Sequence, residues 1–157
     1  MTGTTRRLGR TAALIAVGAT AALALAGTAS AAGGGGGGLV KGTPCTYSAR
    51  SCVELRTNRA WLIHDGRITR GPVGISHGGE GKETPVGTFQ VQWKDQNHKS
   101  AEFNNAPMPF SVFFAQGGIA FHEGNPKSLS AGCVHLGHDD AIAWFDDLQV
   151  GDEVQIH

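Results

Sequence analysis

Short apolar runs separated by turn residues constrain the fold of this chain more than any other feature of its sequence. Asp65-Gly66 and Gln116-Gly117-Gly118 lie between such runs, and this arrangement is typical of strands joined by hairpins. The runs are Cys52–Leu55, Ala60–Ile63, Phe89–Trp93, Ser111–Phe114 and Ile119–Phe121. We therefore expect a mainly β domain of largely antiparallel strands, built as a β sandwich or a mixed sheet.

One segment near the C-terminus has helical periodicity instead. Its apolar residues recur at i, i+3, i+4 and i+7, and Asp139-Asp140 precede them, where carboxylates favour the positive end of a helix dipole. These apolar residues are Ala141, Trp144, Phe145 and Leu148. We expect one C-terminal helix that covers the sheet, followed by a last strand over 153–156.

Two further expectations concern the rest of the domain. The polar segment Asp95–Pro109 contains two prolines, which predicts a long loop, and a long loop in a small domain often borders a functional site. Trp61, Trp93 and Trp144 are expected in the core, because a domain of this size needs its largest apolar side chains there.

The N-terminal segment has the layout of a secretory signal peptide. Arg6, Arg7 and Arg10 precede an uncharged, alanine-rich stretch that ends at Thr28-Ala29-Ser30-Ala31, and basic, apolar and small residues in this order are typical of exported precursors. We predict a signal peptide over 1–31, a glycine-rich flexible linker over 32–42 and one folded domain over 43–157. The exported protein is then secreted, with no stable membrane span.

Net charge argues against a nucleic-acid partner. The whole chain carries 13 basic and 13 acidic side chains. Loss of the three arginines of the signal peptide leaves the exported protein mildly acidic. Such a surface offers no basic field to attract phosphates.

The three cysteines divide into a pair and a single residue. Cys45 and Cys52 are close in sequence, and an oxidising compartment favours a structural disulfide between them. Cys133 then has no intramolecular partner. A buried inert thiol is one interpretation of this residue, but its neighbours indicate chemistry.

Two histidines lie near Cys133. A thiol needs a base or a cation to form the thiolate, because its free pKa is about 8.5. His122 follows the apolar run Ile119–Phe121, and a short loop separates it from Cys133, so the two side chains could face each other. His135 lies on the same face as Cys133 if the backbone is extended. The amides of Gly132 and Cys133 are candidate oxyanion donors. This pattern indicates acyl transfer through a cysteine.

The segment that holds these residues, Phe121–Leu136, resembles the active-site motif of the L,D-transpeptidase catalytic domain, the YkuD-type family. That motif is a histidine, a loop, then Ser/Thr-His-Gly-Cys, an apolar residue and Arg or Asn. Glu83–Phe89 resembles the family's Thr-Pro-x-Gly-x-Phe segment, and Met108–Ser111 with Gly118–His122 resembles its run into the first histidine. The likeness extends over roughly Ser51–Ile156.

The resemblance implies the YkuD-like fold and a specific reaction. A cysteine attacks the third residue of a peptidoglycan stem tetrapeptide, D-alanine leaves, and an amine of a second stem resolves the thioester into a 3→3 cross-link. By this resemblance Cys133 is the nucleophile, His122 the general base, Ser130 and Gly132 motif residues of the oxyanion loop, and His135 a substrate contact. The expected partners are donor and acceptor stems at the cell wall, for a monomer without cofactor or metal.

The chain departs from the family motif at three points. Ala131 stands where the family has the histidine before Gly-Cys, His135 replaces the usual Arg or Asn, and the loop between His122 and Cys133 is shorter than usual. One interpretation is an active variant in which His135 partly replaces the lost imidazole. The other is a degenerate domain that only binds the wall.

Two more alternatives remain open from sequence. An L,D-carboxypeptidase would use the same residues with water in place of the amine. A zinc site formed by His122, Cys133, His135 and His138 is chemically plausible, although the spacing of these residues fits no common zinc pattern and the family motif accounts for the first three without metal.

Overall fold

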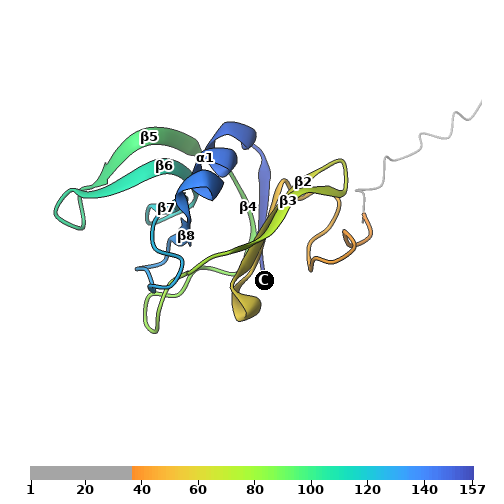
Figure 1. Ribbon diagram of the computed structural model, residues 1–157, viewed down its shortest axis with the longest axis horizontal. Coiled ribbons are helices and arrows are strands. Elements are labelled where there is room, and N and C mark those ends of the chain that lie inside the picture. The colour runs from red at the N-terminus through yellow and green to blue at the C-terminus, as the bar shows by residue number, and fades with distance from the viewer. Residues whose placement is uncertain (1–36) are drawn as a thin grey trace, which may run out of the picture. The chain divides into compact units, whose positions relative to one another are not determined.

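The computed structural model describes residues 37–157. This part of the chain forms two mixed β-sheets, a short 3-10 helix and one α-helix, α1 (Figure 1). The predicted mainly β fold is therefore confirmed. The predicted signal peptide and residues 32–36 of the predicted linker lie outside the described residues.

The first sheet has five strands in the order β3-β2-β1-β9-β4. Neighbouring strands are antiparallel except β1 and β9, which run parallel. The 3-10 helix and the left-handed Asn58 connect β1 to β2. The elements are β1 (Ser51–Glu54), η1 (Leu55–Thr57), β2 (Arg59–His64), β3 (Arg67–Gly74), β4 (Gly87–Gln90) and β9 (Glu153–Ile156).

The second sheet has four strands in the order β5-β6-β7-β8. Its last pair, β7 and β8, is parallel and the others are antiparallel. The strands are β5 (Trp93–Ser100), β6 (Ala106–Ala115), β7 (Ile119–Glu123) and β8 (Val134–Leu136). The two parallel pairs, one in each sheet, are what make the sheets mixed.

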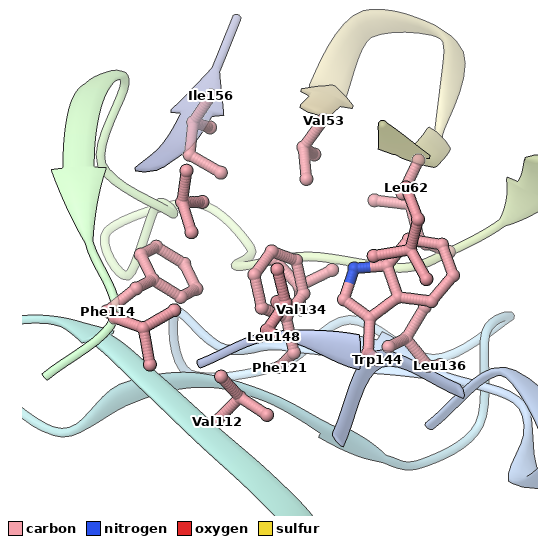
Figure 2. Packing of buried hydrophobic residues seen from close by; sticks show 14 of the residues in the cluster. Val53, Leu62, Val112, Phe114, Phe121, Val134, Leu136, Trp144, Leu148 and Ile156 are labelled. Atoms are coloured by element: carbon pink, nitrogen blue, oxygen red, sulfur yellow. The ribbon is translucent and has the colours of Figure 1, made fainter. Parts of the chain in front are cut away.

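The main core lies where the two sheets and the helix meet. Figure 2 shows Val53, Leu62 and Ile156 of the first sheet facing Val112 and Phe121 of the second. All five are at most 3% exposed. Removal of each such side chain from water stabilises the fold by about 2 kcal/mol.

The helix α1 (His138–Asp147) follows β8 directly. Asp139 and Asp140 occupy its first turn as expected, and Asp140 also accepts a 2.8 Å hydrogen bond from Arg70 on β3. On its buried face the Trp144 indole donates to Ser51 Oγ at 2.9 Å. The helix therefore fixes the end of β8, and with it the residues just before β8.

Two sequence predictions in this region are wrong. Asp95–Pro109 is not a long loop, because most of it belongs to the paired strands β5 and β6. The run Phe89–Trp93 is not one strand: β4 ends at Gln90 in the first sheet and β5 begins at Trp93 in the second.

The physical reasons lie in the environment of β5 and β6. The strand β5 is at the edge of its sheet, so polar side chains suffice there. Pro107 and Pro109 pair with β5 at positions where β6 has no pairing with β7. A missing proline N–H is tolerated where one side of the strand is unpaired.

Cys45 and Cys52 form the predicted disulfide, with an S–S distance of 2.00 Å. Both are completely buried in a small cluster with Val40, Ala49, Trp61 and Ile63. Val40 lies within the segment predicted as linker, yet it is buried and its amide donates to Cys45 O at 2.8 Å. Packing onto the domain thus begins at or before Val40.

Candidate active site

A cavity of about 580 Å³ opens on the second sheet. The hairpin of β5 and β6 supplies one part of its wall, and the segment from β7 to β8 supplies the other. Cys133, His122, His135 and Ser130 all line it. The structure therefore brings together four of the residues that the sequence singled out, although no hydrogen bond joins Cys133 to His122 among the described residues.

The parallel pairing of β7 and β8 places the two histidines. His122 lies opposite His135 in the register, and their rings meet edge to face with centroids 4.8 Å apart. Cys133 precedes β8 by one residue, two positions before His135, so an extended backbone puts both on one face. The strand pairing, not sequence proximity, is what brings His122 to this group.

His122 is held as a neutral imidazole with a defined tautomer. Its Nδ1–H donates to Glu123 O at 2.7 Å, which leaves Nε2 as the acceptor. The pKa of His122 is lowered from 6.5 to about 4, mainly by burial and to a smaller extent by the neighbouring His135 and His98, while the hydrogen bond to Glu123 O and the Glu123 charge oppose the shift. Near pH 7 the residue is a base that carries no proton on Nε2.

Cys133 is a protonated thiol at rest. Burial raises its pKa, and the negative charge of Glu102 adds to this, while a hydrogen bond from the Ala120 backbone opposes it. The Sγ atom donates to Gly118 O at 3.6 Å. The site therefore pairs a neutral thiol with a neutral imidazole, rather than a thiolate with an imidazolium.

Hydrogen bonds within residues 130–133 shape the loop before Cys133. Ser130 Oγ accepts from the Gly132 amide at 3.0 Å and donates to Cys133 O at 2.5 Å. Gly132 has a φ of +119°, and a Cβ there would come within 2.6 Å of Ile119 Cδ1. Because the Gly132 amide is used inside the loop, the Cys133 amide is the better candidate for an oxyanion donor.

Thr84 ties this loop to the preceding segment. Its buried hydroxyl donates to Gly132 O at 2.7 Å and accepts from the Gly78 amide at 3.0 Å. In the sequence, Thr84 belongs to the segment Glu83–Phe89 that resembles a family motif, but the motif assigns it no role. The hydrogen bonds of the Thr84 hydroxyl to Gly132 O and the Gly78 amide give a physical reason for a threonine at this position.

Ser76 plays a similar part for His135. Its hydroxyl lies 3.2 Å from His135 Nδ1 and donates to Ser128 O, which also accepts from His135 Nδ1 at 3.1 Å. Backbone hydrogen bonds of Ser76 also cover the free edge of β8. Nothing in the sequence pattern marked this serine.

Three other observations complete the description of the site. Trp93, expected in the core, is 43% exposed and lines the cavity, whereas Trp61 and Trp144 are buried. Across residues 37–157, no three histidine, cysteine or carboxylate side chains converge as metal ligands would, so the zinc alternative gains no support. Over the same residues no helix is long and apolar enough to cross a membrane.

Comparison with known proteins identifies the domain. Residues 48–156 match the family model of the YkuD L,D-transpeptidase catalytic domain. The chain belongs to this family, as its motifs indicated. No curated protein sequence matches the chain.

Solved structures of L,D-transpeptidases share the fold of this chain. An L,D-transpeptidase from Stackebrandtia nassauensis is 27% identical, with a TM-score of 0.63, over 68% of this chain and 54% of that one. L,D-transpeptidase 3 from Mycobacterium tuberculosis with a faropenem-derived adduct is 16% identical, with a TM-score of 0.62, over 70% and 60%. A cysteine-to-serine mutant of the Enterococcus faecium enzyme is 18% identical, with a TM-score of 0.62, over 70% and 50%. The chain thus spans 50 to 60% of the length of these relatives.

Proposed function

We propose that this protein is a cysteine-dependent L,D-transpeptidase that acts on peptidoglycan stem tetrapeptides and forms 3→3 cross-links. The observation that carries the proposal is the cavity in which Cys133 and a neutral His122 lie together. Membership of the YkuD family supports it. The disulfide Cys45–Cys52 and the predicted signal peptide support a secreted protein that works at the cell wall.

In the proposed first half-reaction, Cys133 Sγ attacks the carbonyl carbon of the third stem residue. His122 Nε2 takes the thiol proton as the new C–S bond forms, and the Cys133 amide stabilises the oxyanion. The C–N bond to D-alanine then breaks, and the proton on His122 goes to the leaving amine. The product is a thioester, which the amine of a second stem converts to an amide.

His135 is the proposed contact for the substrate on this side of the cavity. Its Nδ1 is fixed by Ser128 O, so its Nε2 edge is left for the substrate. The ring also packs against His122, where it supports the general base. In this way His135 partly compensates for the imidazole that Ala131 lacks.

Incubation with a disaccharide tetrapeptide, followed by mass spectrometry of the products, tests the proposal. We expect release of D-alanine together with cross-linked dimer, both abolished by Cys133→Ala. Tripeptide without dimer would identify an L,D-carboxypeptidase instead. Absence of any D-alanine release would contradict an enzymatic role and favour a wall-binding module.

A further inference from the structure

A histidine–carboxylate pair on strand β5 lies at the cavity, and the proposed reaction has not used it. His98 Nδ1 lies 3.2 Å from Asp95 Oδ2, and the other carboxylate oxygen of Asp95 accepts a 3.0 Å hydrogen bond from the Asn97 amide. The carboxylate is therefore held by its own backbone, and it holds the imidazole in turn. His98 lines the cavity together with Cys133 and His122.

Packing against β6 places His98 near the nucleophile. His98 lies opposite Met108 in the pairing of β5 with β6, and its ring meets the Phe113 ring edge to face, with centroids 4.9 Å apart. Met108 and Phe113 belong to one buried cluster, and Cys133 packs against that cluster. His98 and Cys133 are thus neighbours of the same apolar group within one cavity.

The backbone of β6 makes this arrangement possible. Side chains of a regular strand alternate between its two faces, which would turn Met108 and Phe113 to opposite sides. Phe110 lies between them with a φ of 56°, a conformation that is uncommon for a bulky residue and is often found at functional sites. It interrupts the alternation, and both Met108 and Phe113 line the cavity with His98.

His98 and His122 have different environments in this cavity. His122 is buried, and repulsion from a charged His98 is among the causes that lower its pKa to about 4, so the two imidazoles are within electrostatic reach of each other. His98 instead has the Asp95 carboxylate beside it. A carboxylate in this position orients the imidazole and stabilises the imidazolium that forms when the ring takes a proton. Two titratable groups in such different environments are typical of a divided acid–base task.

The contact with Asp95 also defines which nitrogen of His98 can act. Because Nδ1–H donates to the carboxylate, Nε2 carries the lone pair. Nε2 makes no hydrogen bond within residues 37–157, so it is free to accept a proton from a bound nucleophile. A general base reaches that proton directly or through one water molecule.

We propose that His98, oriented by Asp95, is the general base of the second half-reaction, in which an amine resolves the thioester on Cys133. This inference rests on the proposed function. The neutral amine attacks the thioester carbonyl carbon while His98 Nε2 takes one proton from its nitrogen. The C–S bond then breaks, and Cys133 Sγ leaves with the electron pair and takes a proton from solvent. His98 releases its own proton to solvent, and an amide and the free thiol result.

His98→Gln tests this role, because it should separate the two half-reactions. We expect dimer formation from a disaccharide tetrapeptide to become slower by about 10²-fold, the lower end of the usual contribution of a general base. Acylation of Cys133 by imipenem near pH 7 should keep its rate, because His122 is the base of that step. The acyl-enzyme should therefore accumulate during turnover, which rapid-quench mass spectrometry of the intact protein measures.

Two further variants complete the experiment. Asp95→Asn should slow dimer formation about tenfold and leave acylation unchanged, because an amide does not stabilise the imidazolium. Gln96→Ala alters an exposed residue of the same strand that does not line the cavity, and it should change neither rate.

The outcomes separate this inference from the function on which it rests. A parallel loss of acylation and dimer formation in His98→Gln would indicate a structural role and overturn the inference, and so would unchanged dimer formation. A wild type that forms no acyl-enzyme would overturn the proposed function itself.

Discussion

Burial shifts the pKa values of Cys133 and His122 in opposite directions, and both shifts favour the neutral form of the side chain. It raises the pKa of the thiol and lowers that of the imidazole, because it disfavours the charged form of either group. The thiolate therefore forms only as the proton moves to His122 with substrate bound. The sequence indicated these two residues, but this protonation state depends on burial, which the sequence does not display.

The depressed pKa of His122 sets the acid limit of the proposed reaction. A general base must be unprotonated, so acylation by imipenem should fall on acidification with an apparent pKa of about 4. Stopped-flow or mass-spectrometric rates between pH 3.5 and 8 measure this. An inflection near the ordinary histidine value of 6.5 would argue against a buried neutral base.

The same shift affects folding stability. Between pH 6.5 and about 4, His122 is protonated in the unfolded chain and neutral in the folded protein. The free energy of unfolding should therefore decrease as pH falls through this window. The contribution is about 3 kcal/mol. Urea unfolding at pH 7 and pH 4 measures it, and His122→Gln should show the smaller pH dependence.

Among the structural elements, the loop before β8 depends on contacts that are distant in sequence. Thr84 holds Gly132 O and the Gly78 amide with one hydroxyl. Thr84→Val should leave both groups unsatisfied and cost about 2 kcal/mol of stability, with a larger loss of acylation rate, while Thr84→Ser keeps the hydroxyl. Equal acylation rates in the two variants would show that this contact does not position Cys133.

The strands themselves were predictable to different degrees. Runs with apolar side chains, such as Ala60–Ile63 and Ile119–Phe121, were recognised because consecutive residues are buried on both faces of the strand and the sequence there is continuously apolar. The hairpin of β5 and β6 was missed because an edge strand needs no apolar alternation and because prolines are tolerated where β6 is paired on one side only.

At the scale of the whole molecule, the disulfide and the cavity belong to separate parts of the domain. Cys45 and Cys52 pack in a cluster of which no member lines the cavity. Cys45→Ala/Cys52→Ala should therefore lower stability by about 2 kcal/mol, as expected for a short loop, and leave the acylation rate unchanged at temperatures where the protein stays folded. Thermal unfolding and imipenem acylation of the same samples measure both. A parallel loss of acylation in folded protein would contradict this separation.

The central claim is that Cys133 is a nucleophile activated by His122. Intact-protein and peptide mass spectrometry after incubation with imipenem tests it most directly. We predict one covalent adduct on the peptide that contains Cys133, none with Cys133→Ala, and formation slower by about 10²-fold with His122→Gln. A folded wild-type protein that forms no adduct, or forms one at another residue, would contradict the account.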